Sequence, residues 1–201
     1  MNTLKEIREF RGEYRWLSSF APFPVRIRHA TSAVTITYPT REHAYQATKT
    51  LDMPERIRIA TLATPQEAKQ AGKHLALRPD WETICVKVMR SIIRAQIKQH
   101  PKLRANLLAT GNTRLVEGNR WGDMRWGIDL RTGEGTNWLG EAWMAERGAL
   151  RGEETMQPPA PAEDRTPAKT VSNKPSICAT HGTPLLLEHG SGGRFSCPRC
   201  S

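Results

Sequence analysis

Three polar side chains in the first half of the chain have the spacing of one helix face. Glu42, Gln46 and Lys49 lie in the segment Arg-Glu-His-Ala-Tyr-Gln-Ala-Thr-Lys, residues 41–49. Positions i, i+4 and i+7 share a helix face, and the carboxylate and amine would lie about 10 Å apart along the axis. They could therefore act on opposite ends of one small group. The ordinary alternative is a carboxylate that stabilises the helix N-terminus and a solvated surface amine.

A second group of candidate residues combines tryptophan with a carboxylate in a glycine-containing loop. Trp121, Asp123 and Trp126 lie within the segment Trp-Gly-Asp-Met-Arg-Trp-Gly, residues 121–127. Indole rings beside an acid suit a site that stacks a planar base or ring. The alternative is a tryptophan-lined edge of the core in which Asp123 caps a turn. A glycine-rich approach to Asn137 could hold phosphate, or Asn137 could simply be a helix N-cap.

The last residues of the chain contain two pairs of metal-ligand side chains. Cys178 and His181 are separated by two residues, and so are Cys197 and Cys200. Two such pairs around a hairpin-sized insert supply the thiolate and imidazole ligands of a tetrahedral Zn²⁺ site. Alternatives are two disulfides, a redox pair formed by the last two cysteines, or His189 as a ligand in place of His181.

The insert between the two ligand pairs has the pattern of a β-hairpin. Apolar residues at 185–187 and Arg-Phe at 194–195 enclose a glycine-rich turn. Residues 177–201 therefore resemble a zinc ribbon. A module of this size has almost no core, so we expect a structural zinc ion to fold it. Zinc ribbons usually contact nucleic acid or a protein partner, and we expect such a contact here.

The net charge of the chain limits the classes of partner that the protein is expected to bind. The 201 residues include 30 Lys and Arg against 20 Asp and Glu, for a formal net charge of +10, and most of the excess lies in residues 1–150. A basic domain attracts polyanions such as nucleic acid and nucleotides, although the excess could also serve solubility alone. No apolar run reaches the roughly 18 residues of a membrane span, and the N-terminus has no signal-peptide pattern. We therefore expect a cytoplasmic protein without membrane contact.

Composition divides the chain into three parts. Residues 151–176 are rich in proline and contain no aromatic side chain. Such a segment buries too little apolar surface to offset the entropy lost on folding, so it predicts a flexible linker. The expected organisation is a large domain at 1–150, this linker, and the ribbon-like module at 177–201.

The elements expected to position the candidate residues are mainly helical. Alternating β-branched residues at 25–28 and 33–38 predict one short antiparallel strand pair. Capping residues, prolines and apolar periodicity predict helices at 41–51, from Thr64-Pro65, at 81–99, from Pro101 to Gly111, and from Asn137 to Arg147. The predicted fold class is mainly α with a small antiparallel β element.

Five motifs follow one another in the large domain. They are Phe10-x-Gly-x-Tyr-x-x-Leu-Ser-x-Phe20, Glu42-His-Ala-Tyr-Gln-Ala-x-Lys49, Leu108-x-Thr-Gly111 with Glu117, Asp123-x-x-Trp-Gly127, and Gly135-x-Asn-x-Leu-Gly-x-x-x-Met-x-x-Arg147. Together, across residues 7–150, they resemble the NADAR family of YbiA-like N-glycosidases. The resemblance implies a compact, mainly helical fold with a small β element, and hydrolysis of a bond between ribose and nitrogen. Two substrate classes are implied: ADP-ribose on guanine bases, and phosphorylated intermediates of riboflavin biosynthesis.

The same resemblance implies roles for individual residues. Glu42, Lys49 and Asp123 are the expected catalytic residues, with no catalytic cofactor. Carboxylates stabilise the oxocarbenium character that develops when a ribosyl C–N bond breaks, and a lysine of lowered pKa could capture ribose C1 as a Schiff base. The residues expected to bind substrate are Ser19, Tyr45, Gln46, Trp121, Trp126 and Asn137. The residues expected near a pyrophosphate are Arg8, Arg41 and Lys87.

One departure from the family pattern concerns the substrate. Ser19 stands where the family usually has Asn, so substrate preference or rate could differ. The basic large domain and the ribbon favour ADP-ribosylated nucleic acid over a phosphorylated ribosyl metabolite. The competing hypotheses are a module that binds ADP-ribose or nucleotides without hydrolysing them, and a zinc-ribbon regulator whose large domain is only structural.

Overall fold

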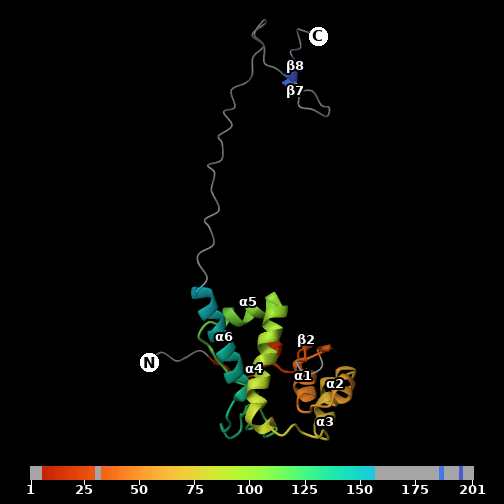
Figure 1. The fold of residues 1–201 in the computed structure, drawn as a ribbon. Coiled ribbons are helices and arrows are strands. Elements are labelled where there is room, and N and C mark those ends of the chain that lie inside the picture. Colours follow the sequence, from red (N-terminus) through yellow and green to blue (C-terminus); the bar gives the residue numbers. More distant parts are fainter. Residues whose placement is uncertain (1–5, 30–32, 157–185, 188–194, 197–201) are drawn as a thin grey trace. The chain divides into compact units, whose positions relative to one another are not determined.

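The computed structural model describes residues 6–29, 33–156, 186–187 and 195–196. The chain divides into two units, Met1–Gln157 and Pro158–Ser201. The described part of the first unit is mainly helical, as predicted (Figure 1). Its helices are η1 (Gly12–Leu17, a 3-10 helix), α1 (Arg41–Thr48), α2 (Met53–Ala60), α3 (Pro65–Ala71), α4 (Trp81–Gln99), α5 (Pro101–Ala109) and α6 (Trp138–Met156). No helix in these ranges is long and apolar enough to cross a membrane.

The predicted strand pair is present, and two further pairs were not predicted. β2 (Val25–Arg28) and β3 (Thr35–Tyr38) are antiparallel, with Val25 opposite Tyr38. The unpredicted pairs are parallel and join β1 (Glu6–Ile7) to β4 (Arg114–Leu115) and β5 (Gly118–Asn119) to β6 (Ile128–Asp129). Strands of two residues show no alternation, so only their tertiary neighbours define them.

Helix starts follow local capping chemistry. The Thr64 hydroxyl accepts a hydrogen bond from the Glu67 backbone N–H, and the Glu67 carboxylate accepts one from the Thr64 backbone N–H, which is the predicted capping box. Helix α2 was not predicted, although Asp52 caps it and Pro54 lies in its first turn. Its eight residues contain two arginines and only a short apolar pattern, so periodicity alone did not reveal it.

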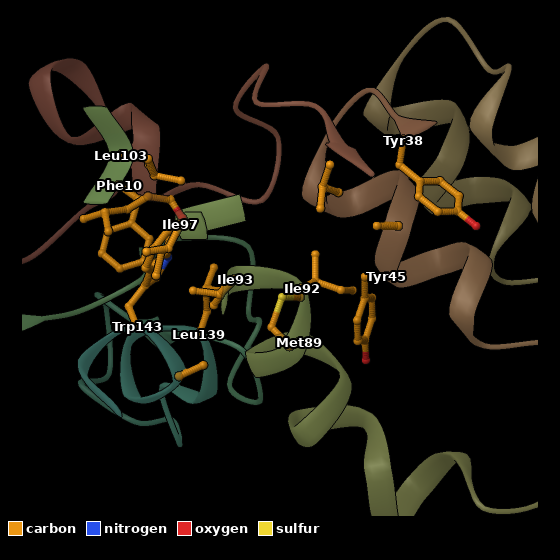
Figure 2. Close-up of a cluster of buried hydrophobic side chains, with 14 of the residues drawn as sticks. Phe10, Tyr38, Tyr45, Met89, Ile92, Ile93, Ile97, Leu103, Leu139 and Trp143 are labelled. Atoms are coloured by element: carbon orange, nitrogen blue, oxygen red, sulfur yellow. The ribbon is translucent and has the colours of Figure 1, made fainter. Parts of the chain in front are cut away.

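Helix α4 is the centre of the core (Figure 2). Met89 and Ile92 lie on its side toward Tyr45 of α1, while Ile93 lies on its side toward Trp143 of α6. Contacts of α4 with α1, α5, α6 and β2 place these segments around it. A helix buried on two sides needs a wide apolar surface, which its sequence supplies. Helix α4 therefore fixes the position of α1, which carries the candidate residues Glu42 and Gln46 and ends just before Lys49.

The end of α6 differs from the predicted domain boundary. The composition change placed the start of a linker at residue 151, whereas α6 continues to Met156. Helices form from backbone hydrogen bonds and do not require apolar side chains at every turn. The remainder of the predicted linker lies outside the described residues.

Only four residues of the second unit are described. β7 (Leu186–Leu187) and β8 (Phe195–Ser196) are antiparallel, with Leu187 opposite Phe195, in agreement with the predicted hairpin. The predicted metal ligands Cys178, His181, Cys197 and Cys200 lie outside the described residues. Within the described ranges, no cluster of His, Cys, Asp and Glu could hold a metal ion. The zinc site stays a prediction.

Gly140 provides a direct test of how closely α6 packs against the backbone of Leu115. A Cβ at Gly140 would lie 2.2 Å from the Leu115 backbone oxygen, which cannot move aside. We expect Gly140→Ala to lower the free energy of unfolding by about 1–3 kcal/mol, despite alanine's better helix propensity. The matched control is Gly148→Ala in the same helix, where a Cβ meets nothing within 4 Å. That variant should gain up to about 1 kcal/mol in chemical denaturation. Equal effects at the two glycines would contradict this packing.

Candidate active site

A cavity of about 600 Å³ lies beside α1 and gathers most of the predicted site residues. All three predicted catalytic residues line it, as do five of the six predicted to bind substrate. The residues concerned are Ser19, Glu42, Tyr45, Gln46, Lys49, Trp121, Asp123 and Trp126. The volume is in the range of small-molecule sites. Segments from the turn after η1 to Leu139 of α6 contribute, so the site exists only in the folded chain.

Helix α1 supplies the first three side chains as the sequence predicted. Thr40 caps the helix through the His43 backbone N–H, and residues 41–47 are all buried. The helix ends at Thr48 rather than residue 51, and Lys49 is its C-cap with helical backbone angles. Glu42, Gln46 and Lys49 therefore still share one face, which is directed at the cavity.

Burial shifts the pKa values of the two ionisable groups on this face in opposite directions. Glu42 is 6% exposed, and burial raises the pKa of its carboxyl group. Gln46 Nε2 donates to Glu42 Oε1 at 2.7 Å, which partly opposes that rise. Burial lowers the pKa of the Lys49 amine, and the Glu42 carboxylate opposes this shift. An amine of lowered pKa provides more of the neutral, nucleophilic form near neutral pH.

Glu117 is a functional candidate to which the sequence analysis assigned no role. It lines the cavity, and burial, helped by the nearby Asp123 carboxylate, raises its pKa to about 7. Glu117 Oε2 and Gln46 Oε1 are buried without a hydrogen-bond partner among the described residues. Unpaired buried acceptors are uncommon and are typical of places where a ligand supplies the partner. The one signal for Glu117 in the sequence was its place in the third of the five motifs.

Asp123 combines the two interpretations that the sequence left open. Its Oδ1 accepts hydrogen bonds from the backbone N–H groups of Arg125 at 3.1 Å and Trp126 at 2.9 Å, so it does cap a turn. It also lines the cavity. The turn fixes the carboxylate and the following Trp126 in one rigid arrangement. Asp123 is therefore held in place by its own loop.

An aromatic wall borders the cavity. Tyr45 lies 5.1 Å, between ring centroids, from both Trp81 and Trp126, and Trp126 lies 5.7 Å from Trp138 in an edge-to-face arrangement. Edge-to-face packing of this kind holds rings in fixed orientations. Trp121 is 57% exposed at the same cavity. The wall is therefore preorganised to contact a planar ring.

Three further cations at the cavity were not predicted as site residues. Lys69 and Lys73 line it from α3 and the turn that follows, and Arg125 lines it from the loop after Asp123. Arg125 also donates to Glu82 Oε2 at 2.6 Å. Only tertiary packing brings these residues to Lys49. They make the cavity rim suitable for phosphate groups.

Asn137 is not among the lining residues. Its Oδ1 accepts from the Glu117 backbone N–H at 3.0 Å, and its Nδ2 donates to the Leu115 carbonyl at 2.8 Å. It is 2% exposed and has a φ of 52°. Both ends of its amide therefore hold the segment that carries Glu117, and Asn137, which was predicted to bind substrate, lies outside the lining of this cavity.

The three residues predicted near a pyrophosphate also lie elsewhere. Arg41 is 1% exposed and donates to Gln96 Oε1 and the Leu17 carbonyl. Arg8 is exposed and pairs with Glu6 at 3.4 Å, while Lys87 lines a different cavity. The direction of each of these side chains depends on tertiary packing, which neither a basic residue type nor a position in the sequence indicates.

These features define a class of protein. A cavity that joins buried carboxyl groups, an amine of lowered pKa and an aromatic wall has the groups needed to break a bond between a sugar and a planar base. Residues 7–151 match the NADAR domain. The chain therefore belongs to the NADAR family, and it is a hydrolase of the N-glycosidase class.

Several relatives share most of this domain. N-glycosidase YbiA of Escherichia coli (strain K12) is 38% identical over 140 residues, which cover 69% of this chain and 82% of that protein. Riboflavin biosynthesis protein PYRR, chloroplastic, of Zea mays is 32% identical over 149 residues, which cover 67% of this chain and 23% of that protein. The NMR structure of E. coli YbiA matches with a TM-score of 0.64 at 32% identity, over 78% of this chain and 94% of that chain. The resemblance read from the five motifs is confirmed.

Proposed function

We propose that this N-glycosidase removes ADP-ribose from guanine in nucleic acid by hydrolysing the bond between ribose C1 and a base nitrogen. The observation that carries the proposal is that Lys49, whose amine pKa is lowered by burial, shares one cavity with the buried carboxyl groups of Glu42 and Glu117. An amine of lowered pKa beside two carboxyl groups of raised pKa matches the demands of ribosyl C–N cleavage.

In the proposed reaction, Lys49 is the nucleophile. Its neutral Nζ attacks ribose C1, and the base leaves with the electron pair of the C–N bond and a proton from Glu117. The proton lost by Nζ passes through Glu42 to the ring oxygen, which opens the ring and leaves a Schiff base at C1. The Asp123 carboxylate stabilises the positive charge that develops at C1. Water then hydrolyses the protonated Schiff base, which releases the ribosyl product, restores the neutral amine and returns a proton to Glu117.

Substrate binding would use the rest of the cavity. The aromatic wall of Tyr45 and Trp126 would stack on the base, and the exposed Trp121 could extend this surface. Lys69 and Lys73 would meet the phosphates. The net charge of +10 supports a polyanionic substrate.

A second candidate substrate class is favoured by one observation. Relatives in Zea mays and Arabidopsis thaliana are named as riboflavin biosynthesis proteins. A phosphorylated ribosyl intermediate of that pathway would use the same amine, carboxyl groups and lysines. We keep this class as the alternative, and in both cases catalysis uses no cofactor.

The experiment compares both substrate classes with the wild-type protein and Lys49→Ala. Purified protein is incubated with ADP-ribosylated guanine DNA and with phosphorylated ribosyl intermediates of riboflavin synthesis, and released products are measured by mass spectrometry. Release of ADP-ribose from DNA by the wild type but not by Lys49→Ala supports the proposal. Release from the metabolites alone selects the alternative. Binding of ADP-ribose without release from either substrate would favour a non-catalytic module.

We also propose that residues 177–201 hold one structural Zn²⁺ ion through Cys178, His181, Cys197 and Cys200, and that this module contacts nucleic acid or a protein partner. Metal analysis of the purified chain should find about one zinc per chain, because two thiolate-containing pairs complete a tetrahedral site.

A paired comparison tests the zinc prediction. Cys197→Ser with Cys200→Ser should lose the zinc, because structural sites need all four ligands. Cys85→Ser is the control, since Cys85 is a free, buried cysteine in α4. Equal zinc content in both variants would rule out this ligand set. His181→Ala beside His189→Ala identifies which histidine is the ligand.

A further inference from the structure

A second cavity, of about 550 Å³, lies between β2, the end of α1, α2 and α4. Five cationic side chains line it, and among its described lining residues there is no Asp or Glu. The five are Arg26, Arg28, Arg56, Arg78 and Lys87. Of these, Arg78 is the one with an ion pair in the described residues, to Asp80 at 2.6 Å. The cavity therefore carries an excess of positive charge that the described part of the chain does not balance.

Arg56 is the most unusual of these cations. Its side chain is only 4% exposed, yet its hydrogen bonds go to neutral acceptors. Nε donates to the Thr50 carbonyl at 2.8 Å, and Nη1 donates to His29 Nδ1 at 2.8 Å. A buried charge without a counter-ion is costly, and an anionic ligand would remove that cost. Burial and Arg56 also lower the pKa of His29, so the imidazole does not supply a further charge.

The cavity floor is apolar. Ile27 of β2 and Val88, Ile92 and Ala95 of α4 form this surface, with the Ser91 hydroxyl group beside it. A cationic rim over an apolar floor suits an organic phosphate better than a bare inorganic ion. The apolar surface would contact a planar ring, while the guanidinium and ammonium groups would bind the phosphate.

We propose that this second cavity binds one nucleotide through its phosphate group. The nucleotide could be free or part of a strand, since the phosphate chemistry is the same. The two cavities share a common wall: Thr48 lines the second and Lys49 the first, and the Arg78 backbone N–H donates to the Lys49 carbonyl at 2.8 Å. A strand whose modified nucleotide lies in the first cavity would then place another nucleotide in the second. This last consequence rests on the proposed function, whereas nucleotide binding does not.

The test measures binding rather than hydrolysis. The variant is Arg28→Gln with Lys87→Gln, because both side chains are exposed and their loss should leave folding intact. The matched control is Lys98→Gln with Lys102→Gln, which removes the same charge from exposed positions outside both cavities. The probes are 5′-AMP and an unmodified oligothymidylate of about twelve nucleotides. Thermal melting confirms that both variants remain folded.

Loss of two phosphate contacts has a defined signature. For the oligonucleotide, the cavity variant should bind about tenfold more weakly than the control, and its salt dependence should fall by about one unit of log–log slope. The His29 ring resonances provide a local readout, because His29 accepts from Arg56 inside the cavity. Addition of a probe that occupies the cavity should shift these resonances in the wild type and in the control.

Each outcome either supports or overturns nucleotide binding in the second cavity. Weaker binding of both probes by the cavity variant, with His29 shifts in the wild type, supports a site for a single nucleotide. Weaker binding of the oligonucleotide alone supports a site for a strand. Binding equal to that of the control for both probes, or unchanged His29 resonances, overturns the proposal. Because no hydrolysis is measured, failure of the ADP-ribose proposal would leave this result unaffected, and the reverse also holds.

Discussion

Lys49→Arg is expected to lower kcat by about 10³-fold or more while leaving the fold intact. Arginine keeps the positive charge at the end of α1, but its guanidinium stays protonated and cannot form a Schiff base. Burial lowers the pKa of the Lys49 amine, which increases the neutral fraction that the proposed attack requires. Single-turnover kinetics on whichever substrate class is hydrolysed gives the effect on the chemical step.

The control for this prediction lines the same cavity. Lys73 is exposed at the rim, so Lys73→Arg should retain kcat to within about a few-fold and change mainly KM. Borohydride trapping adds a covalent readout, since reduction of a Schiff base would attach the ribosyl group to a peptide containing Lys49. Substantial turnover by Lys49→Arg, or trapping at another lysine, would remove Lys49 from the nucleophile's role.

Glu117→Gln should lower kcat by about 10²–10⁴-fold, the range for loss of a general acid. Burial and the Asp123 carboxylate raise the pKa of Glu117 to about 7, so its acid form persists near neutrality. An acid that must be protonated loses its effect as pH rises through its pKa. The wild-type kcat/KM should therefore fall above a pH of about 7, and this alkaline limb should be absent in Glu117→Gln.

The same substitution makes a prediction about stability. The folded-state pKa of Glu117, about 7, is above its ordinary value of 4.5. The stability gained from holding the proton is complete below the ordinary value and is lost as pH rises through about 7. Glu117→Gln cannot ionise, so relative to the wild type it should gain up to about 3 kcal/mol between pH 4 and pH 8. Thermal melting at the two pH values measures this change.

A matched substitution of another acid separates the role of Glu117 from the effect of removing any one negative charge. Glu141→Gln replaces an exposed carboxylate in the first turn of α6, away from the cavity. It should leave both the alkaline limb and the pH dependence of stability as in the wild type. If Glu117→Gln behaved in the same way, Glu117 would be an ordinary surface carboxylate and not the proposed acid.

Local sequence was sufficient for most helices and for the first candidate face. The capping box at Thr64, the N-cap at Thr40 and the long apolar pattern of α4 each depend on residues within a few turns. The i, i+4, i+7 stripe of Glu42 and Lys49 is likewise a property of one helix. The motifs also carried the family assignment, because residue types and spacing can be compared without a structure.

Tertiary packing decided which residues share the site and how they titrate. Glu117 and Lys73 reach the cavity from segments far from α1, and no local pattern indicates that. Packing also directed the Asn137 amide to the backbone of Leu115 and Glu117, outside the cavity lining, and it buried Arg56 in a second basic cavity. The physical reason is that helix caps and periodicity are short-range, whereas burial, and the pKa shifts it causes, depend on what surrounds a side chain in three dimensions. The sequence by itself determined most of the helices, the motifs and the candidate nucleophile, and only the fold decided which acid, which cations and which second pocket accompany it.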